Sequence, residues 1–194
     1  MTKKLDASDY ERAARELGVP VAAIRAVVDV ESRGSGFLPD GRPVILFERH
    51  IMRRQLRAKG IDTEPLEREQ PNVVSSKAGG YQGGTLEHDK LGQAAKINRE
   101  AALESASWGL FQIMGFHWEL LGYERVQAFV NAMYRSEGDQ LDAFVRFVKA
   151  NPSIHKALKA QDWARFAKGY NGPEYAKNKY DTKLATAFAR HGTV

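Results

Sequence analysis

The chain has 194 residues, of which 43% are hydrophobic and 27% are charged, and it contains no cysteine. This composition is ordinary for a soluble globular protein, and the lack of cysteine excludes a disulfide framework and a thiolate metal site. There are 29 lysines and arginines against 24 aspartates and glutamates, which gives a formal charge of +5. The positive charge favours polyanionic partners such as nucleic acid, anionic lipid or an anionic cell-wall polymer, without choosing among them.

The N-terminal residues are polar, which does not suit an export signal. No apolar run approaches the roughly 20 residues that span a membrane. We therefore expect a soluble protein that is made in the cytoplasm. We also expect one domain over residues 1–194, with a monomer as the default state.

Two helices are predicted at the start of the chain. Ser8 and Glu11 have the spacing of a capping box, which predicts a helix as far as about Gly18. A second helix follows at once, because Pro20 suits the first turn of a helix and Gly34 suits its end.

Glu31 continues the apolar face of the second predicted helix. The other residues of this face recur at helical spacing: Ile24, Val27 and Val28. A carboxyl group at the end of an apolar stripe is partly desolvated, and desolvation raises its pKa, as a general acid working near neutral pH requires. The alternative is an exposed glutamate that pairs with Arg25 or Arg33.

The next segment predicts a small β-lobe over about residues 36–48. A turn signal at 39–41 (Pro-Asp-Gly) precedes the apolar run Val44–Phe47, which together indicate a short hairpin. A short basic helix is then expected over residues 50–59, ending at Gly60.

Residues 61–84 lack periodicity and contain prolines, serines and the glycine-rich run KAGGYQGG. Loops of this length are uncommon in compact domains and tend to be functional. We interpret the segment as the wall or lid of a cleft that contains Glu31, with a disordered insertion as the alternative.

From Thr85 onward the pattern is helical. One helix is expected over 108–115, opened by Ser105 or Ser107, and a last helix over about 173–190. Further helical segments are expected near 85–97, 116–121, 124–136, 138–149, 152–160 and 162–169. The predicted class is α+β, predominantly α-helical.

Motifs for several other activities are missing from the sequence. It has no P-loop, no GxGxxG pattern and no HExxH pattern. The five histidines do not have metal-ligand spacing: His50, His88, His117, His155 and His191. We expect no metal and no cofactor.

Three short motifs occur in order: Glu31-Ser32, SWGLFQ over residues 107–112, and GYNGP over residues 169–173. Together they resemble the lysozyme-like superfamily, in particular goose-type lysozymes and lytic transglycosylases. The amino-acid sequence around Glu31 and over residues 106–115 is most similar to the muramidase (N-acetylmuramidase) domain of phage endolysins. The resemblance covers about residues 20–175 and implies a large helical lobe and a small β-hairpin lobe flanking a cleft.

The same resemblance implies a set of substrate-binding residues: Ser107, Trp108, Gln112, Tyr170 and Asn171. Each has a local physical rationale. A serine can cap a helix start, glutamine offers a donor and an acceptor to glycan groups, and the Gly-Pro turn presents tyrosine and asparagine. Trp108, Phe111 and Trp118 are aromatic rings that could stack on sugars, although Phe111 and Trp118 fit a core position better.

The implied reaction is cleavage of the β-1,4 bond between N-acetylmuramic acid and N-acetylglucosamine in peptidoglycan, with Glu31 as the general acid. Glu48, which follows the apolar run 44–47, is the best candidate for a second carboxylate. Its alternatives are an ion pair or a structural brace, and the weaker candidates are Glu87, Asp89 and Glu104. If no second carboxylate acts, the resemblance implies a lytic transglycosylase that releases 1,6-anhydro products.

The last predicted helix carries lysines beside an apolar face. This pattern resembles a cationic amphipathic segment that can contact anionic envelope lipids. The alternative is that the apolar face packs on the core of the protein. No separate wall-binding module is expected. The endolysin resemblance implies action on the wall, in the periplasm, after release by a holin. Two hypotheses from other classes compete with this one. The first is a nucleic-acid-binding protein, which would need a basic stripe with interleaved aromatic residues that this sequence lacks. The second is a peptidoglycan-binding protein without catalytic activity.

Overall fold

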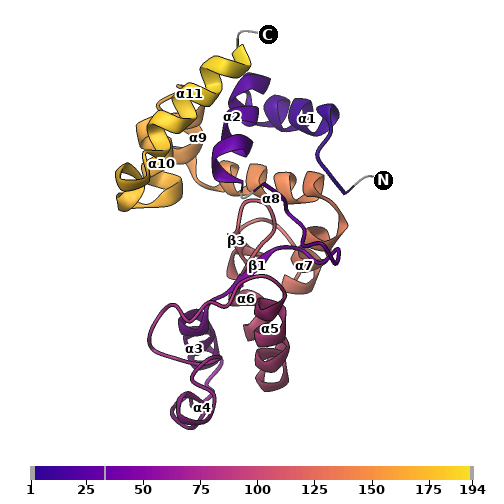
Figure 1. Ribbon diagram of the computed structural model, residues 1–194, viewed down its shortest axis with the longest axis vertical. Coiled ribbons are helices and arrows are strands. Elements are labelled where there is room, and N and C mark those ends of the chain that lie inside the picture. The colour runs from indigo at the N-terminus through magenta and orange to yellow at the C-terminus, as the bar shows by residue number, and fades with distance from the viewer. Residues whose placement is uncertain (1–2, 33, 193–194) are drawn as a thin grey trace. The chain divides into compact units, whose positions relative to one another are not determined.

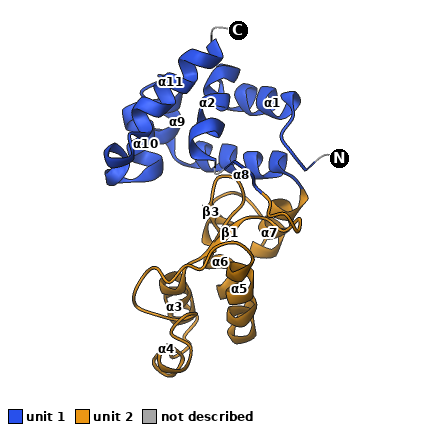
Figure 2. Ribbon diagram, viewed as in Figure 1, with its two compact units in different colours: residues 1–36, 136–194 blue, residues 37–135 orange. Residues whose placement is uncertain are grey.

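The computed structural model describes residues 3–32 and 34–192 and is mostly helical, with one small antiparallel sheet (Figure 1). The α+β class predicted from the sequence is therefore confirmed. The chain divides into two compact units (Figure 2). Unit 1 contains residues 1–36 and 136–194, and unit 2 contains residues 37–135. No described helix is long and apolar enough to cross a membrane.

Unit 1 is helical throughout. Its elements are α1 (Ala7–Leu17), α2 (Val21–Glu31), α8 (Glu137–Ala150), α9 (Pro152–Lys159), α10 (Trp163–Asn171), the short 3₁₀ helix η2 (Pro173–Asn178) and α11 (Tyr180–Gly192). The first helix was predicted correctly, but its cap differs. Asp6 accepts from the backbone N–H of Ser8 and Asp9, and Asp9 returns the bond, so the capping box is formed by this pair and not by Ser8 and Glu11.

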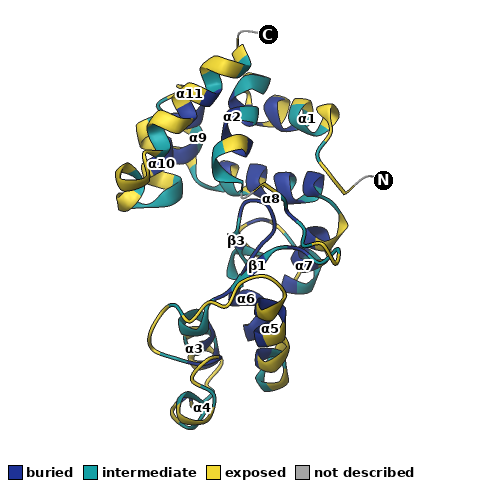
Figure 3. Cartoon of the chain, in the orientation of Figure 1, coloured by how far each residue is buried: buried dark blue, intermediate teal, exposed yellow. Residues whose placement is uncertain are grey.

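Helix α2 forms the core of unit 1. Ile24 and Val27 are completely buried, as the apolar stripe predicted, and α11 and α1 pack against this helix (Figure 3). Helices α1 and α11 therefore cover the apolar residues of α2. The helix ends at Glu31, since Ser32 is extended, and not at Gly34 as expected.

The last helix is not continuous over 173–190. It is divided at Lys179, which has a positive φ of 54°, into η2 and α11. The apolar residues Leu184 and Ala187 of α11 are buried, and α11 packs on α2 and α10. Core packing, the alternative to a lipid-facing role, therefore accounts for this apolar face.

Unit 2 combines short helices with the sheet. Its elements are β1 (Ile45–Phe47), α3 (Arg49–Ala58), α4 (Glu64–Glu69), α5 (Thr85–Ile97), α6 (Arg99–Glu104), β2 (Ala106–Trp108), β3 (Ile113–Met114), the 3₁₀ turn η1 (Gly115–His117) and α7 (Val126–Arg135). The helix predicted over 116–121 is reduced to η1 and the turns after it. Helices α4 and α6 were not predicted.

The sheet has the order β1-β2-β3 and is antiparallel. Ile45 pairs with Trp108, and Ser107 pairs with Met114. The helix predicted over 108–115 is therefore wrong. Gly109 and Gln112 both have positive φ, 69° and 51°, so the chain turns back at 109–112 instead of continuing as a helix.

The predicted hairpin over 36–48 is also different in detail. Its turn is present as a single bridge between Phe37 and Pro43. Strand β1, however, takes β2 as its partner, a segment far away in the sequence.

The segment 61–84 is ordered and contains α4. The Arg49 guanidinium donates to the carbonyl oxygens of Lys77, Pro71 and Ala78 at 2.9, 3.2 and 3.1 Å. The Lys90 ammonium donates to the Gly80 carbonyl. These bonds satisfy a run of carbonyl groups that has no ladder of its own, and they argue against a disordered insertion.

Candidate active site

Glu31 is the last residue of α2, and its carboxyl group is half-buried. Burial raises the pKa of this carboxyl from 4.5 to about 7, although a hydrogen bond from Asn171 and the charge of Lys183 both act to lower it. The direction is the one expected from the apolar stripe of α2. A carboxyl group with this pKa is protonated in a large fraction of molecules at neutral pH and can donate a proton.

Asn171 holds one oxygen of the Glu31 carboxyl. Its side-chain Nδ2 donates to Glu31 Oε1 at 2.8 Å. Asn171 ends α10, and the positive φ of Gly172, 81°, turns the chain into η2. The Gly-Pro sequence thus ends the helix directly after Asn171, which places its amide against Glu31.

Tyr170 lies beside this pair in an aromatic cluster. Its ring stacks on Phe166 with a centroid distance of 5.8 Å, and Phe144 and Phe147 meet it edge-on at 5.5 and 5.8 Å. Burial, and secondarily the negative charge of Glu31, raise the pKa of the Tyr170 phenol. The phenol therefore stays neutral at physiological pH.

The alternative ion pair of Glu31 with Arg25 is not formed. The Arg25 guanidinium lies over the Tyr10 ring, 4.5 Å from its centroid. The other proposed partner, Arg33, is outside the described residues. Asp29, two residues before Glu31, is exposed and pairs with Arg190 and His191.

Glu48 is in unit 2, whereas Glu31 is in unit 1. Glu48 is the N-cap residue of α3, although its side chain makes no hydrogen bond to the first turn, and this side chain is 15% exposed. The Tyr81 hydroxyl donates to both carboxylate oxygens, at 2.8 and 2.9 Å. The His50 Nδ1 atom lies 3.2 Å from Glu48 Oε2. Burial and the Glu48 carboxylate raise the pKa of Tyr81 to about 12, so Tyr81 is a hydrogen-bond donor to a carboxylate.

Two weaker candidates for the second carboxylate have structural partners. Burial of Glu87 would raise its pKa, but hydrogen bonds from the backbone N–H of Gln82, Phe47 and Gly83 outweigh burial and lower it. Glu104 accepts from Trp118 Nε1 at 3.0 Å. Asp89, the third, is exposed on α5.

The residues of the 107–112 motif bond mainly to one another. Ser107 Oγ donates to Gln112 Oε1 at 2.9 Å, and Gln112 Nε2 donates to the Gly109 carbonyl at 2.9 Å. Trp108 is only 1% exposed, and its Nε1 donates to the Leu103 carbonyl. In this arrangement the motif stabilises the β2–β3 turn, and Trp108 presents no free ring face to a sugar.

Phe111 is buried, as its core alternative predicted, and Trp118 is partly exposed and bonded to Glu104. Among residues 3–32 and 34–192 there is no group of histidine, aspartate and glutamate side chains that could hold a metal ion.

Sequence analysis did not identify Tyr81 or Lys183. Tyr81 is the one aromatic residue of the glycine-rich run KAGGYQGG, which could have marked it. Lys183 is one of several lysines of the last helix, and only its proximity to Glu31 distinguishes it.

Helices, a small sheet and a glutamate of raised pKa at a helix end are the features of a lysozyme-like glycosidase. The N-acetylmuramidase family matches residues 20–192, and the chain belongs to this family. It is therefore a glycoside hydrolase that degrades peptidoglycan.

The chain is also similar to a solved structure, the crystal structure of an endolysin of the Burkholderia phage AP3. The two chains are 53% identical, with a TM-score of 0.97, and the match covers all of this chain and 74% of that one. No curated protein is similar enough to add to this comparison.

Proposed function

We propose that the protein is a peptidoglycan-degrading endolysin that cleaves the β-1,4 bond between N-acetylmuramic acid and N-acetylglucosamine with Glu31 as the general acid. The observation that carries this proposal is the Glu31 carboxyl, half-buried at the end of α2 with a pKa of about 7. An ordinary exposed glutamate would be almost fully ionised at neutral pH and would have no proton to give.

Asn171 gives this acid a defined orientation. Because its Nδ2 donates to Oε1, the proton of the neutral carboxyl is carried on Oε2. From Oε2 the proton passes to the glycosidic oxygen as the bond to the muramic acid carbon breaks. The carboxylate that remains is stabilised by the Asn171 hydrogen bond and by the charge of Lys183, the two interactions that favour the charged form.

Glu48 is the second carboxylate that we propose for the reaction. Tyr81 fixes both of its oxygens, and His50 faces one of them, so the group is held in one orientation. A positioned carboxylate can activate a water or stabilise the positive charge that develops on the sugar. The competing role is a brace that ties the 77–84 loop to the start of α3.

A lytic transglycosylase is the alternative chemistry. It requires Glu31 as acid and then as base, and it requires no second carboxylate. We further propose, from the named relative and the net charge of +5, that the protein acts as a monomer on the anionic wall of its host and causes lysis. Release to the periplasm through a holin, and contact of the exposed basic residues of α11 with the envelope, belong to the same proposal.

Mass spectrometry of the soluble fragments from digested peptidoglycan tests this function. Fragments with N-acetylmuramic acid at the reducing end are expected and define a hydrolase. Anhydro-muramic ends would favour the transglycosylase. Fragments that end in reducing N-acetylglucosamine would contradict the assigned bond, and a folded sample that releases no fragments would contradict catalysis.

A further inference from the structure

A pocket of about 450 Å³ lies between α2 and α11 of unit 1 and is not used by the mechanism above. Its apolar lining includes Val30 and Ala187. Its polar lining includes Thr182, Lys183 and Thr186 of α11, and Lys179, which lies between η2 and α11. The pocket therefore combines an apolar wall with ammonium and hydroxyl groups.

Lys183, Thr186 and Arg190 form one stripe along α11, at the i, i+3, i+7 spacing of a single helix face. Lys179 lies directly before this helix, at the break where φ is 54°. Asp181, the acidic residue in the first turn of α11, does not line the pocket. The spacing places it on roughly the opposite side of the helix, where it does not offset the charge of the stripe.

Arg190 and Asp29, which also line the pocket, neutralise each other through an ion pair. Lys179 and Lys183 have no such neighbour, since no carboxylate of the described residues forms an ion pair with either ammonium group. Lys183 instead lies near the Tyr180 ring, 5.6 Å from its centroid. Two ammonium groups that form no ion pair within the described residues are thus available to an anionic group.

The pocket adjoins the general acid. Val30, which lines it, directly precedes Glu31 in α2, and the charge of Lys183 reaches the Glu31 carboxyl. A group bound beside Lys183 therefore lies within electrostatic reach of the Glu31 carboxyl.

We propose that this pocket binds a carboxylate of the peptide stem carried by the muramic acid at the cleaved bond. The proposal rests on the proposed function and deepens it by naming a substrate group. In peptidoglycan the sugar rings are neutral, and the stem that hangs from the lactyl group carries carboxylates. Ammonium and hydroxyl donors suit such a group, and the apolar wall suits the aliphatic chain beside it.

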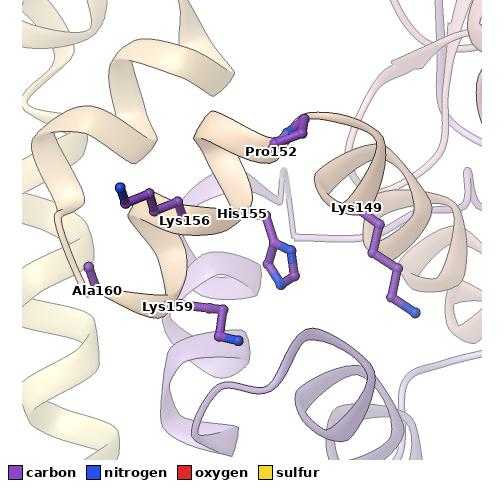
Figure 4. Close-up of a pocket in the computed structure, with 6 residues that line it drawn as sticks. All are labelled: Lys149, Pro152, His155, Lys156, Lys159 and Ala160. Carbon is purple, nitrogen blue, oxygen red and sulfur yellow. The ribbon is translucent and has the colours of Figure 1, made fainter.

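Binding of an anionic group in this pocket must be distinguished from the general attraction between a basic protein and an anionic wall. A second pocket of unit 1 provides a matched control (Figure 4). It is lined by Lys149, Lys156 and Lys159, among others, and Lys149 is already paired with Glu16 at 2.7 Å. Lys156 and Lys159 are on α9, and neither has a charge effect on Glu31.

The kinetic test compares two double variants of equal charge, Lys179→Gln with Lys183→Gln and Lys156→Gln with Lys159→Gln. Rates are measured at pH 5.5, where Glu31 is protonated in both. On peptide-bearing glycan strands the α11 variant is expected to show KM raised about tenfold. The α9 variant is expected to match the parent, and Lys179→Arg with Lys183→Arg is expected to restore KM.

Strands stripped of stems by an amidase distinguish the source of the carboxylate. They keep only the free lactyl carboxylate, and on them the α11 variant is expected to show the KM of the parent. If its KM defect persists on stripped strands, the pocket binds the lactyl carboxylate and the stem proposal is overturned. Equal KM increases in the α9 and α11 variants would also overturn it, because they would show attraction by net charge alone.

Calorimetry tests the pocket without catalysis. In a Glu31→Gln background, a soluble disaccharide that carries a stem is expected to bind about tenfold more weakly once Lys179 and Lys183 are both glutamine. Unchanged binding would overturn the pocket proposal. A parent enzyme that cleaves no glycan would instead overturn the proposed function, and the binding measurement would still decide whether the pocket accepts the stem.

Discussion

Glu31 and Glu48 are both glutamates at a helix boundary, but their surroundings differ. Glu31 ends α2, where the helix dipole disfavours negative charge, and its one hydrogen-bond donor is the neutral amide of Asn171. Glu48 precedes α3, where the dipole attracts negative charge, and the Tyr81 hydroxyl donates to both of its oxygens. The same type of side chain thus lies once at the end of a helix beside a neutral amide and once at the start of a helix beside a phenol.

The difference also concerns what each residue does for the fold. Glu31 contributes one hydrogen bond to α10, so its replacement leaves the helical core of unit 1 intact. Glu48 links the start of α3 to the glycine-rich loop through Tyr81. A substitution that lowers activity therefore identifies the catalytic acid only if the stability of the same variant is also measured.

The largest expected effect is that of Glu31→Gln. The amide has nearly the same shape but no acidic proton, so the rate of peptidoglycan cleavage should fall by about 10² to 10⁴-fold. Release of new reducing ends measures the rate, and circular dichroism with a melting curve controls for folding. A folded variant that clears walls at the parent rate would remove Glu31 from the mechanism.

Glu48→Gln should lower the rate by about 10 to 100-fold if Glu48 is a second catalytic carboxylate. The melting temperature should change little, because the glutamine oxygen still accepts from Tyr81. Tyr81→Phe serves as the matched control, since it leaves the carboxylate in place and removes only its donor. A fall in melting temperature in both variants, with activity retained, would instead establish the brace.

The pH dependence of kcat/KM should separate the two carboxyls. Activity should decline as the pH rises through about 7, because Glu31 loses the proton that it must donate. Asn171→Ala removes a hydrogen bond that lowers the pKa of Glu31, so the decline should move to higher pH. A profile with no basic limb, or an unchanged limb in this variant, would be inconsistent with Glu31 as the titrating acid.

The smallest effect concerns stability. The pKa of Glu31 is about 7 in the folded protein against 4.5 for an ordinary glutamate, so between these values the folded state holds more protons and stability falls as pH rises. At about 1.4 kcal/mol per pKa unit the whole shift is at most about 3 kcal/mol, and partial exposure reduces it to about 1 to 2 kcal/mol.

Glu31→Gln removes the loss of stability that the titration of Glu31 causes as the pH rises. Its stability relative to the parent should therefore increase by about 1 to 2 kcal/mol between pH 5 and pH 8. Urea unfolding at both pH values gives the difference. If Glu31→Gln changed the stability by the same amount at both pH values, the Glu31 carboxyl would not be desolvated. Glu31 and Glu48 would then not differ in the way described above.

The sequence alone determined most of the longer helices and the position of Glu31 at the end of one of them. The spacing of Ile24, Val27 and Val28 placed Glu31 on the buried face of a helix, and burial explains its raised pKa. Helix signals of this kind act over three or four residues, so they are visible in a short window of sequence. The three motifs in order likewise predicted the family that the comparison found.

Only the tertiary structure decided the sheet and the partners of the site residues. Strands β1 and β2 have three residues each, too few to show an alternating pattern, and they pair over a long separation in sequence. The positive φ of Gln112 turns its side chain to the turn itself, where it bonds to Ser107. Tyr81 reaches Glu48 because Arg49 and Lys90 hold the loop that carries it. Such contacts join residues that are distant in the chain, so the local periodicity of the sequence cannot predict them.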